Sequence, residues 1–345
     1  GRIEIVATPQ ETLADLWSLA GGPVEALERT TILGHDPVLP SIFRVGTAAA
    51  AVAAATGLAV SELWLARTGR AQTVTVDVRT ASIAFRSERY LRVNDGPPPK
   101  SWDDLAGYYR IDDGGWIQLH TNFPHHRQGF LNLLGCEPTR AAVQDALNGW
   151  EGATFEQEAA EHGLCSGLLR SSAQDLARMR PGIVCVSLSA FGHRGSWSER
   201  RGFDSIVQTV SGIAHAGGKA HAGGKAADDG GPKPLPCQAL DHASGFLAAF
   251  GAMIALRRRT LEGGSWHVQL SLAQTGRWIE SLGRIQALNH PNPGPEDIVD
   301  LLQILDSPFG KITYVDSAVG LSETPPHWCC PPVPLGTHPP EWPAR

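Results

Sequence analysis

A pattern that occurs twice along the chain of 345 residues constrains its fold more than any other feature. A Leu-Pro pair, an alanine-rich stretch, a glycine and alternating apolar residues follow one another from Leu39 to Val78 and again from Leu235 to Leu272. Leu39 and Leu235 are 196 positions apart, whereas Val74 and Val268 are 194 apart, so the copies differ by a small insertion or deletion. A strand–loop–helix–strand unit that is used twice predicts a duplicated α/β chain.

Each copy predicts a long helix followed by a strand. The alanine-rich stretches predict helices over about residues 46–66 and 241–258, and the small side chains of the first permit close helix approach. Strict alternation over residues 72–78 predicts a strand, as does the run 267–272. Residues 183–189 form a compact apolar run, which is typical of a buried parallel strand.

The other predicted elements follow from apolar spacing and turn residues. Helices are predicted over residues 11–30, 126–134, 140–148 and 154–162, and a strand over 116–120. The segment 214–226 contains His-Ala-Gly-Gly-Lys-Ala twice and predicts a flexible loop. Beyond Pro308 the many prolines predict a tail that wraps over the surface without regular structure.

Charge, cysteine content and missing motifs exclude several classes of protein. The formal charge of −6 leaves no large basic field, so nucleic acid is not an expected partner. The six cysteines are scattered without a C-x-x-C pair, which argues against structural zinc and a disulfide framework and favours a reducing, cytoplasmic location, with mitochondria or peroxisomes as alternatives. The most apolar run, residues 47–66, is interrupted by Glu62, so we expect a soluble helix and no membrane partner. The chain has no G-x-S-x-G, P-loop or G-x-G-x-x-G sequence.

Asp241 is the residue with the most informative surroundings, because it is predicted to open the second long helix after a glycine-rich loop. Aspartate is a favoured N-cap residue, which is one interpretation. The other is a nucleophilic carboxylate, whose ionised form a helix N-terminus favours and whose small neighbours leave room for a bulky substrate. The matching residues 45–47 of the first copy contain no carboxylate, although Thr47 could act as a cap there.

Two other stretches are candidate binding sites. At residues 187–192 a predicted strand ends in small residues and glycine. This pattern is typical of a ligand site at the carboxyl end of a strand, and equally of an ordinary exit into a loop. The segment from His120 to Arg127 contains three histidines. It predicts a surface loop, with a substrate or phosphate contact through Arg127 or a metal site as alternatives.

Several motifs, in order, resemble the family III CoA-transferases, the CaiB/BaiF group. Residues 180–192 resemble the family's strand and S-x-F-G turn, and residues 201–204 resemble its R-x-G-[YFH]-D element. Asp241 with Gly245 falls where the family has its catalytic aspartate. Residues 267–272 resemble its V-D-x-S-L strand, and residues 67–72 its R-T-G-x-G-Q turn. Residues 104–177, including Asp113 to Trp116, resemble its smaller domain.

The resemblance implies an enzyme that transfers coenzyme A between an acyl-CoA and a carboxylic acid, with no metal. Asp241 would attack the thioester to form a mixed anhydride, and the returning CoA thiolate would give an aspartyl-CoA thioester. The residues implied to bind CoA are Ser189, Phe191, Gly192, Arg201, Gly202 and Gln238. Related racemases have a histidine where Phe203 stands, which favours a transferase over a 2-methylacyl-CoA racemase and leaves His242 as a substitute. A non-catalytic relative that binds CoA or a partner chain is the other alternative.

The implied fold is α/β: an incomplete Rossmann-like parallel sheet with alanine-rich helices, plus a smaller α+β domain. The predicted divisions are residues 1–103 (first, degenerate repeat portion), 104–177 (small domain), 178–290 (second repeat portion with the nucleophile) and 291–345 (proline-rich wrap). The family's D-L-[ST]-x-x-x-A-G-P strand is missing before residue 180, which predicts an internally shortened chain that lacks its central Rossmann segment. A homodimer is also implied, unless the duplicated chain satisfies that contact within itself.

Overall fold

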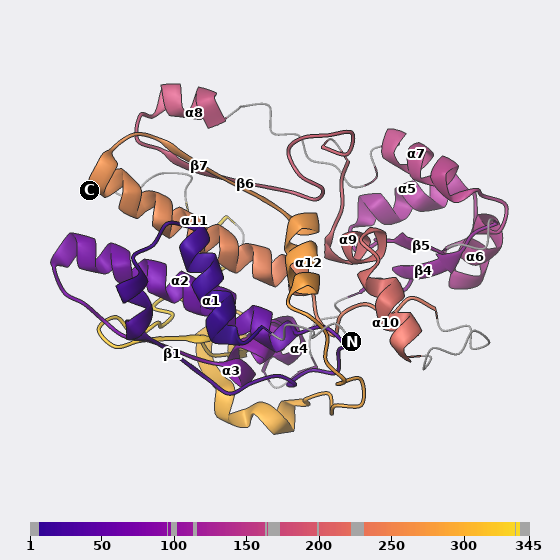
Figure 1. Ribbon diagram of the computed structural model, residues 1–345. Coiled ribbons are helices and arrows are strands. Elements are labelled where there is room, and N and C mark those ends of the chain that lie inside the picture. Colours follow the sequence, from indigo (N-terminus) through magenta and orange to yellow (C-terminus); the bar gives the residue numbers. More distant parts are fainter. Residues whose placement is uncertain are drawn as a thin grey trace, which may run out of the picture.

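The computed structural model describes residues 7–94, 96–97, 102–112, 116–162, 164, 173–198, 200–221, 231–334 and 336–338. A larger body holds two long helices with short parallel strands, and a smaller lobe holds a hairpin with three helices (Figure 1). The predicted α/β class is confirmed. Two parallel strand pairs and two long apolar helices are present, and an antiparallel hairpin with helices forms the smaller part.

The first unit consists of β1 (Thr30–Leu33), α2 (Val45–Thr68) and β2 (Val74–Asp77). β1 and β2 pair in parallel, with Thr30 opposite Val74. α3 (Val78–Ala84) follows β2, and α4 (Ser87–Tyr90) follows α3. Before β1, α1 (Pro9–Leu19) and the 3-10 helix η1 (Val24–Arg29) replace the single helix predicted over 11–30. The prediction was wrong because Gly21 takes a left-handed conformation with φ 69° and Pro23 follows it.

The second unit consists of β6 (Val184–Ser189), α11 (Ala239–Glu262) and β7 (Trp266–Ser271), followed by α12 (Leu272–Ser281). One helix, α8 (Ala173–Met179), precedes β6. Two helices follow it before α11, namely α9 (Asp204–Val210) and α10 (Ile213–His221). β6 and β7 are parallel, as predicted for this segment, with Val184 opposite Trp266. The prediction that β6 is buried was wrong, because Val186 and Leu188 are 39% and 53% exposed.

The two units share helix starts, helix ends and helix caps at equivalent positions, each 194 residues apart. The long helices begin at Val45 and Ala239, and each ends at a glycine with positive φ, Gly69 and Gly263. A side chain caps the next helix in both units, from Asp77 to the Thr80 amide and from Ser271 to the Gln274 amide. These correspondences agree with the predicted repeat, but a duplication of the gene stays a prediction.

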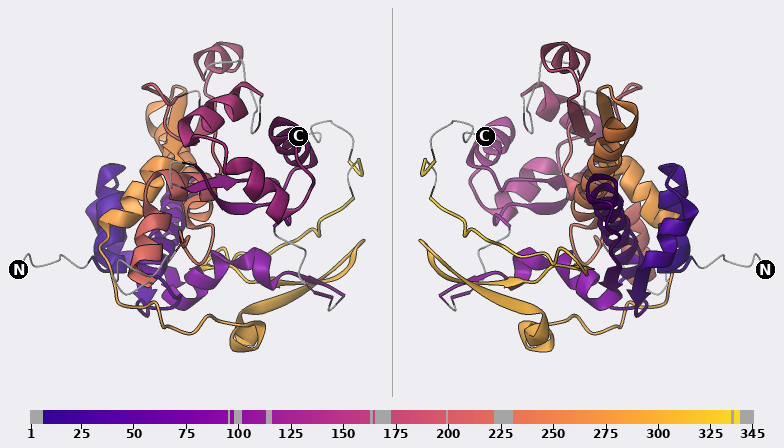
Figure 2. Two further views of the ribbon diagram at one scale, coloured as in Figure 1. Left: turned by 90° about the vertical axis from the view of Figure 1, so that its right-hand side faces the viewer. Right: turned by 90° about the vertical axis from the view of Figure 1, so that its left-hand side faces the viewer.

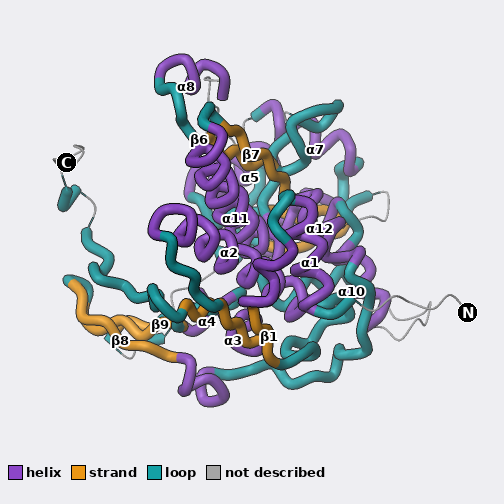
Figure 3. Tube along the Cα trace, turned by 60° about the vertical axis from the view of Figure 1, so that its left-hand side comes forward, coloured by secondary structure: helices purple, strands orange, loops and turns teal. Residues whose placement is uncertain are grey.

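α2 and α11 pack against each other, with the β6–β7 pair on the far side of α11 (Figure 3). The Thr56 hydroxyl of α2 donates to the Phe246 carbonyl oxygen of α11 at 2.9 Å. Residues 48–55 of α2, which are alanines except for Val52, are no more than 1% exposed, so α2 forms the centre of the main hydrophobic cluster. Both helices are long and apolar enough to cross a membrane by length and composition. The most apolar window of α2 is 78% buried within the protein, and that of α11 is 33% buried.

The smaller lobe contains β4 (Gly107–Arg110) and β5 (Trp116–Leu119), an antiparallel pair. Its helices are α5 (Pro124–Leu134), α6 (Arg140–Leu147) and α7 (Gly152–Glu161), close to the predicted ranges. The lobe has its own hydrophobic cluster, which includes Tyr109, Phe130, Leu147 and Phe155. The predicted divisions at residues 103, 177 and 290 stay predictions, and Asp113 to Gly115 lie outside the described residues.

The C-terminal part differs from its prediction because it contains strands. After η2 (Pro295–Leu301), β8 (Leu302–Ser307) and β9 (Gly310–Val315) form a hairpin at one edge of the molecule (Figure 2). β9 also pairs with β3 (Arg92–Val93), and β10 (Val319–Leu321) joins β2. The free edges of β3 and β2 supply hydrogen-bonding groups for these strands, which proline content alone does not reveal. Beyond Leu321, the described residues form no helix or strand.

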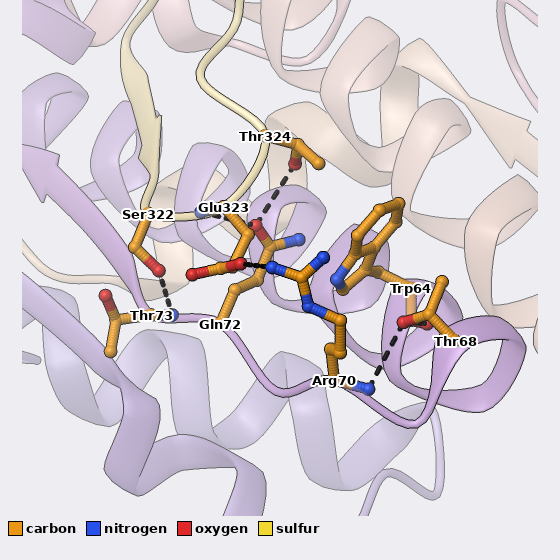
Figure 4. Close-up of polar contacts among 8 residues, drawn as sticks. All are labelled: Trp64, Thr68, Arg70, Gln72, Thr73, Ser322, Glu323 and Thr324. Atoms are coloured by element: carbon orange, nitrogen blue, oxygen red, sulfur yellow. Dashed lines mark hydrogen bonds and ion pairs between the residues drawn. The ribbon is translucent and has the colours of Figure 1, made fainter.

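The segment after β10 is fastened to the turn that joins α2 to β2 (Figure 4). The buried Gln72 side chain accepts hydrogen bonds from the Glu323 amide and the Thr324 hydroxyl at 3.3 and 3.1 Å. Arg70 forms an ion pair with Glu323. The R-T-G-x-G-Q-like turn therefore holds the C-terminal segment in place.

The predicted loop over 214–226 is wrong at its start, because α10 is helical up to His221. The Lys233 amide donates to the Ala214 carbonyl oxygen at 2.8 Å, which ties α10 to the chain before α11. Glycine-rich composition predicts a loop, but here the buried Ile213 and Ala214 pack the helix onto the core. Residues 222–230 lie outside the described residues.

Candidate active site

Asp241 is the third residue of α11, and this position decides between the two interpretations of its role. The N-cap of α11 is Gln238, whose side chain makes no capping hydrogen bond. The cap interpretation of Asp241 is therefore wrong. The helix is capped instead from a distance, by the carboxylate of Asp204 at the start of α9. Asp241 is exposed to solvent. The N-terminal end of α11, where it stands, faces the smaller lobe (Figure 1).

The Asp204 carboxylate is buried, with 2% of the residue exposed. Its Oδ2 accepts hydrogen bonds from the amides of Leu240 and Asp241 at 2.7 and 3.1 Å. The side chain of Gln208, one turn later on α9, donates to Oδ1 at 2.5 Å. Burial first, and then the negative charge of Asp241, raise the pKa of Asp204 to about 7, although these hydrogen bonds favour the ionised form.

The Asp241 carboxylate differs from a structural acid because it accepts no hydrogen bond within the described part of the chain. Partial desolvation raises the pKa of Asp241, and the neighbouring His242 opposes this shift. His242 stacks on Phe85 with ring centroids 5.4 Å apart, and its Nε2 lies 3.5 Å from Glu88 Oε2. Burial alone would raise the pKa of Glu88, but the nearby His242 and other charges lower it. Glu88, from the chain that follows the first unit, thus pairs with His242, the residue next to the candidate nucleophile Asp241.

The residues implied to bind CoA fall into two groups. Ser189 ends β6, and its Oγ accepts a hydrogen bond from the Gly192 amide at 3.0 Å, which shapes the turn that Gly192 makes at φ 107°. A Cβ at Gly202 would lie 3.1 Å from Ala190 Cβ and 3.3 Å from the Phe191 ring. The strand exit and the Arg201-Gly202 stretch therefore lie together, while Gln238 lies at the start of α11.

Two cavities flank α9 near these residues. A cavity of about 600 Å³ contains Arg201 and Gly202, and its walls include Ile117, Phe130 and Leu164 of the smaller lobe. A second cavity of about 180 Å³ is lined by Gln238, Asp204 and Arg89, and the Ser205 hydroxyl in its wall is buried without a hydrogen-bond partner among the described residues. Gln118 lies in the walls of both cavities. The arrangement combines an exposed carboxylate with an apolar cavity and a polar one.

The segment from His120 to Arg127 is not the simple surface loop that was predicted. His120 and His126 are buried, at 8% and 3% exposed, and the His120 ring stacks on Phe203 with centroids 4.0 Å apart. Arg127 pairs with Asp103, which removes the support for a phosphate contact. Within the described ranges, no group of three or more His, Cys, Asp or Glu residues could hold a metal ion.

Sequence reasoning missed the roles of Asp204, Glu88 and His120. The R-x-G-[YFH]-D resemblance contains Asp204 and could have marked it, but no pattern predicts that its carboxylate reaches the amides of α11. Glu88 carries no motif, and His120 stood out only as one of three histidines in a short segment. They come close to the second unit only when the two long helices and the smaller lobe are packed together.

We expect the His120→Phe variant to lose less stability in acid than the wild type. Burial, and then the charge of His126, lower the pKa of His120 to about 4, so the unfolded chain takes up a proton near pH 6.5 before the native protein does. The stability due to neutral His120 is present above pH 6.5 and is lost as the pH falls towards 4, at up to about 1.4 kcal/mol per pH unit. Urea unfolding at pH 7, 6 and 5 tests this. Parallel pH dependences of the two proteins would contradict it.

Comparison with known proteins shows which family part of the chain is similar to. Residues 168–296, which include β6, α9, α11 and β7, match CoA-transferase family III. A probable fatty acyl-CoA transferase of Mycobacterium tuberculosis is 26% identical over 185 residues, covering 52% of this chain and 45% of that protein. The mouse succinyl-CoA:glutarate CoA-transferase is 32% identical over 82 residues, covering 24% of this chain and 17% of that protein. A crystal structure of a CaiB/BaiF family protein from Brucella suis aligns with a TM-score of 0.26 and 20% identity, covering 45% of this chain and 38% of that chain.

These matches confirm the resemblance to the family III CoA-transferases that the motifs predicted. The matched segment contains Asp241 and every residue implied to bind CoA. The chain spans less than half the length of each of these two relatives.

Proposed function

We propose that this protein transfers coenzyme A between an acyl-CoA and a carboxylic acid, with Asp241 as the nucleophile. The observation that carries this proposal is the exposed carboxylate of Asp241 in the first turn of α11. This carboxylate accepts no hydrogen bond from the described residues, while the backbone amide of Asp241 is held by Asp204. A carboxylate that served only as a cap would be turned onto a backbone amide. The family of the matched segment supports the reaction class.

The reaction consists of acyl transfers at carbonyl carbons. Asp241 Oδ attacks the thioester carbonyl, the C–S bond breaks and CoA thiolate leaves, which gives a mixed anhydride. The thiolate then attacks the Asp241 carbonyl carbon and releases the first acid, which leaves an aspartyl-CoA thioester. The acceptor carboxylate attacks this thioester and expels the thiolate, which finally takes the acceptor acyl group from the new anhydride and restores Asp241.

The surroundings of Asp241 suit this chemistry. The positive end of the α11 dipole favours the carboxylate at the third helical position. Its raised pKa makes it a better nucleophile than an ordinary surface aspartate once it is ionised. Two cavities lie beside α9, and Gln238, three residues before Asp241, lines the smaller one. They offer separate places for an apolar acyl group and a small acid, consistent with the named substrates of the fatty acyl-CoA and glutarate transferases.

The proposal is tested by incubating the protein with a panel of acyl-CoAs and free carboxylic acids and following new acyl-CoA species by mass spectrometry. We expect at least one acyl-CoA to form from a free acid. CoA-dependent thermal stabilisation without any transfer would instead support the non-catalytic CoA-binding alternative. Deuterium exchange at the α-carbon of a 2-methylacyl-CoA would favour the racemase, for which Phe203 offers no titratable group, although His120 stacks on its ring.

A further inference from the structure

The capping role of Asp204 has a counterpart in the first unit, and the comparison separates two roles. In the first unit, Asp36 accepts hydrogen bonds from the amides of Gly46 and Thr47 at 3.0 and 2.7 Å. In the second unit, Asp204 accepts hydrogen bonds from the amides of Leu240 and Asp241. These two residues stand 194 positions after Gly46 and Thr47. A remote carboxylate thus holds the same two amides at the start of each long helix.

The two carboxylates differ in the residue that supplies their second amide donor. Thr47 donates its hydroxyl to Asp36 Oδ2 at 2.7 Å, so the first unit pairs a carboxylate with a donor. The matching residue of the second unit is Asp241, which places a like charge beside Asp204. The charge of Asp241 opposes the ionisation of Asp204, an arrangement that weakens the helix cap and gains nothing for the fold.

We propose that Asp204 is a positioning residue for Asp241: it fixes the backbone of the nucleophile through the Asp241 amide, and its negative charge increases the reactivity of the adjacent carboxylate. This inference rests on the proposed function. When Asp241 attacks a thioester, its charge passes to the departing thiolate, so the repulsion between the two carboxylates is relieved as the new C–O bond forms. A cap that acted on structure alone would not need a partner of the same charge.

The groups around Asp204 allow its charge to vary within the neutral pH range. The facing groups are Asp241 on α11, the thiol of Cys237 just before α11, the phenol of Tyr108 on β4, and Arg89 across the smaller cavity. Burial raises the pKa values of Cys237 and Tyr108 above their ordinary values, so both stay neutral when Asp204 ionises. The charge that Asp204 senses most directly among these groups is that of Asp241, which opposes its ionisation.

The first measurement is the rate of acyl-adduct formation on the intact protein from acyl-CoA, between pH 5.5 and 9, in the wild type, Asp204→Asn and the matched control Asp36→Asn. We expect the wild-type rate to increase in a second step near pH 7, where Asp204 ionises. Asp204→Asn should lack this step and react about threefold or more slowly above it, because loss of the adjacent negative charge makes the Asp241 carboxylate a weaker nucleophile. Asp36→Asn should keep the wild-type pH profile although its melting temperature falls.

A second measurement does not depend on turnover. In protein labelled with ¹³C at the aspartate carboxyl carbons, the Asp241 signal, assigned with Asp241→Asn, should show a second inflection where Asp204 titrates. The inflection should vanish in Asp204→Asn and persist in Asp36→Asn. If the wild type forms no adduct at any pH but this coupling is present, the proposed function fails and the electrostatic pairing of Asp204 with Asp241 stands.

Equal loss of melting temperature in Asp204→Asn and Asp36→Asn, with the wild-type pH profile and the wild-type inflection in both, would overturn the inference. If Asp204→Asn does not fold, Gln208→Met replaces it, because it keeps the carboxylate and removes one of its donors. The second inflection should then move to higher pH. An unmoved inflection in Gln208→Met would also overturn the inference.

Discussion

Asp241→Asn is expected to lower the rate of CoA transfer by at least about 10³-fold, because a carboxamide cannot replace a carboxylate as the attacking nucleophile. The two side chains have nearly the same shape, and Asp241 accepts no hydrogen bond from the described residues, so the fold should persist. Loss of the favourable helix-dipole interaction, worth about 0.5 kcal/mol, is offset by relief of the repulsion with Asp204. Acyl-CoA exchange followed by mass spectrometry gives the rate, and thermal unfolding checks the fold.

The matched control for this variant is Asp15→Asn, the same chemical change at an exposed position of α1. It should leave the transfer rate unchanged. A wild-type rate in Asp241→Asn would show that the reaction does not pass through this carboxylate.

Gly57→Ala is expected to destabilise the protein by about 2 kcal/mol, since overpacking of a tight core typically costs about 1–3 kcal/mol. A Cβ at Gly57 would lie 2.8 Å from Cγ1 of Val74 on β2 and 2.7 Å from Cγ1 of Val319 on β10. α2 would have to move away from the sheet, and its other face is held by α11. Urea unfolding at pH 7 gives the free energy.

The control uses the same substitution at Gly245 of α11, where a Cβ would meet nothing within 4 Å. Gly245→Ala should stabilise the protein by about 0.5–1 kcal/mol, because alanine has the higher helix propensity and a less flexible unfolded chain. Gly251→Ala, at the position that matches Gly57, should destabilise, because its Cβ would lie 2.5 Å from Val268 Cγ1. The packing account would be wrong if Gly57→Ala were as stable as the wild type.

The elements with the strongest local patterns could be predicted from the sequence. The alanine-rich helices, the alternation around Val76 and the three helices of the smaller lobe all lie close to their predicted ranges. These patterns are local, since a helix or strand period of apolar residues sets which face is buried. The position of Asp241 in the first turn of a helix also follows from such a pattern.

What could not be predicted depends on contacts between distant segments. β10 joins β2 across more than two hundred residues, and Glu88 of α4 lies within ion-pair distance of His242 of α11 although the two are far apart in the sequence. The capping role of Asp204 was hidden because Asp241 is itself a good capping residue at a helix start. A central Rossmann segment missing from this chain, a homodimer and a cytoplasmic location stay predictions.

The most direct test of the central claim is to trap the acyl-enzyme. The protein is incubated with an acyl-CoA and hydroxylamine, digested, and its carboxyl side chains are examined by mass spectrometry. We predict a hydroxamate on Asp241 that requires acyl-CoA and is absent from Asp241→Asn. A protein that transfers CoA under the same conditions without a hydroxamate on Asp241, or with one on another carboxylate, would contradict the account.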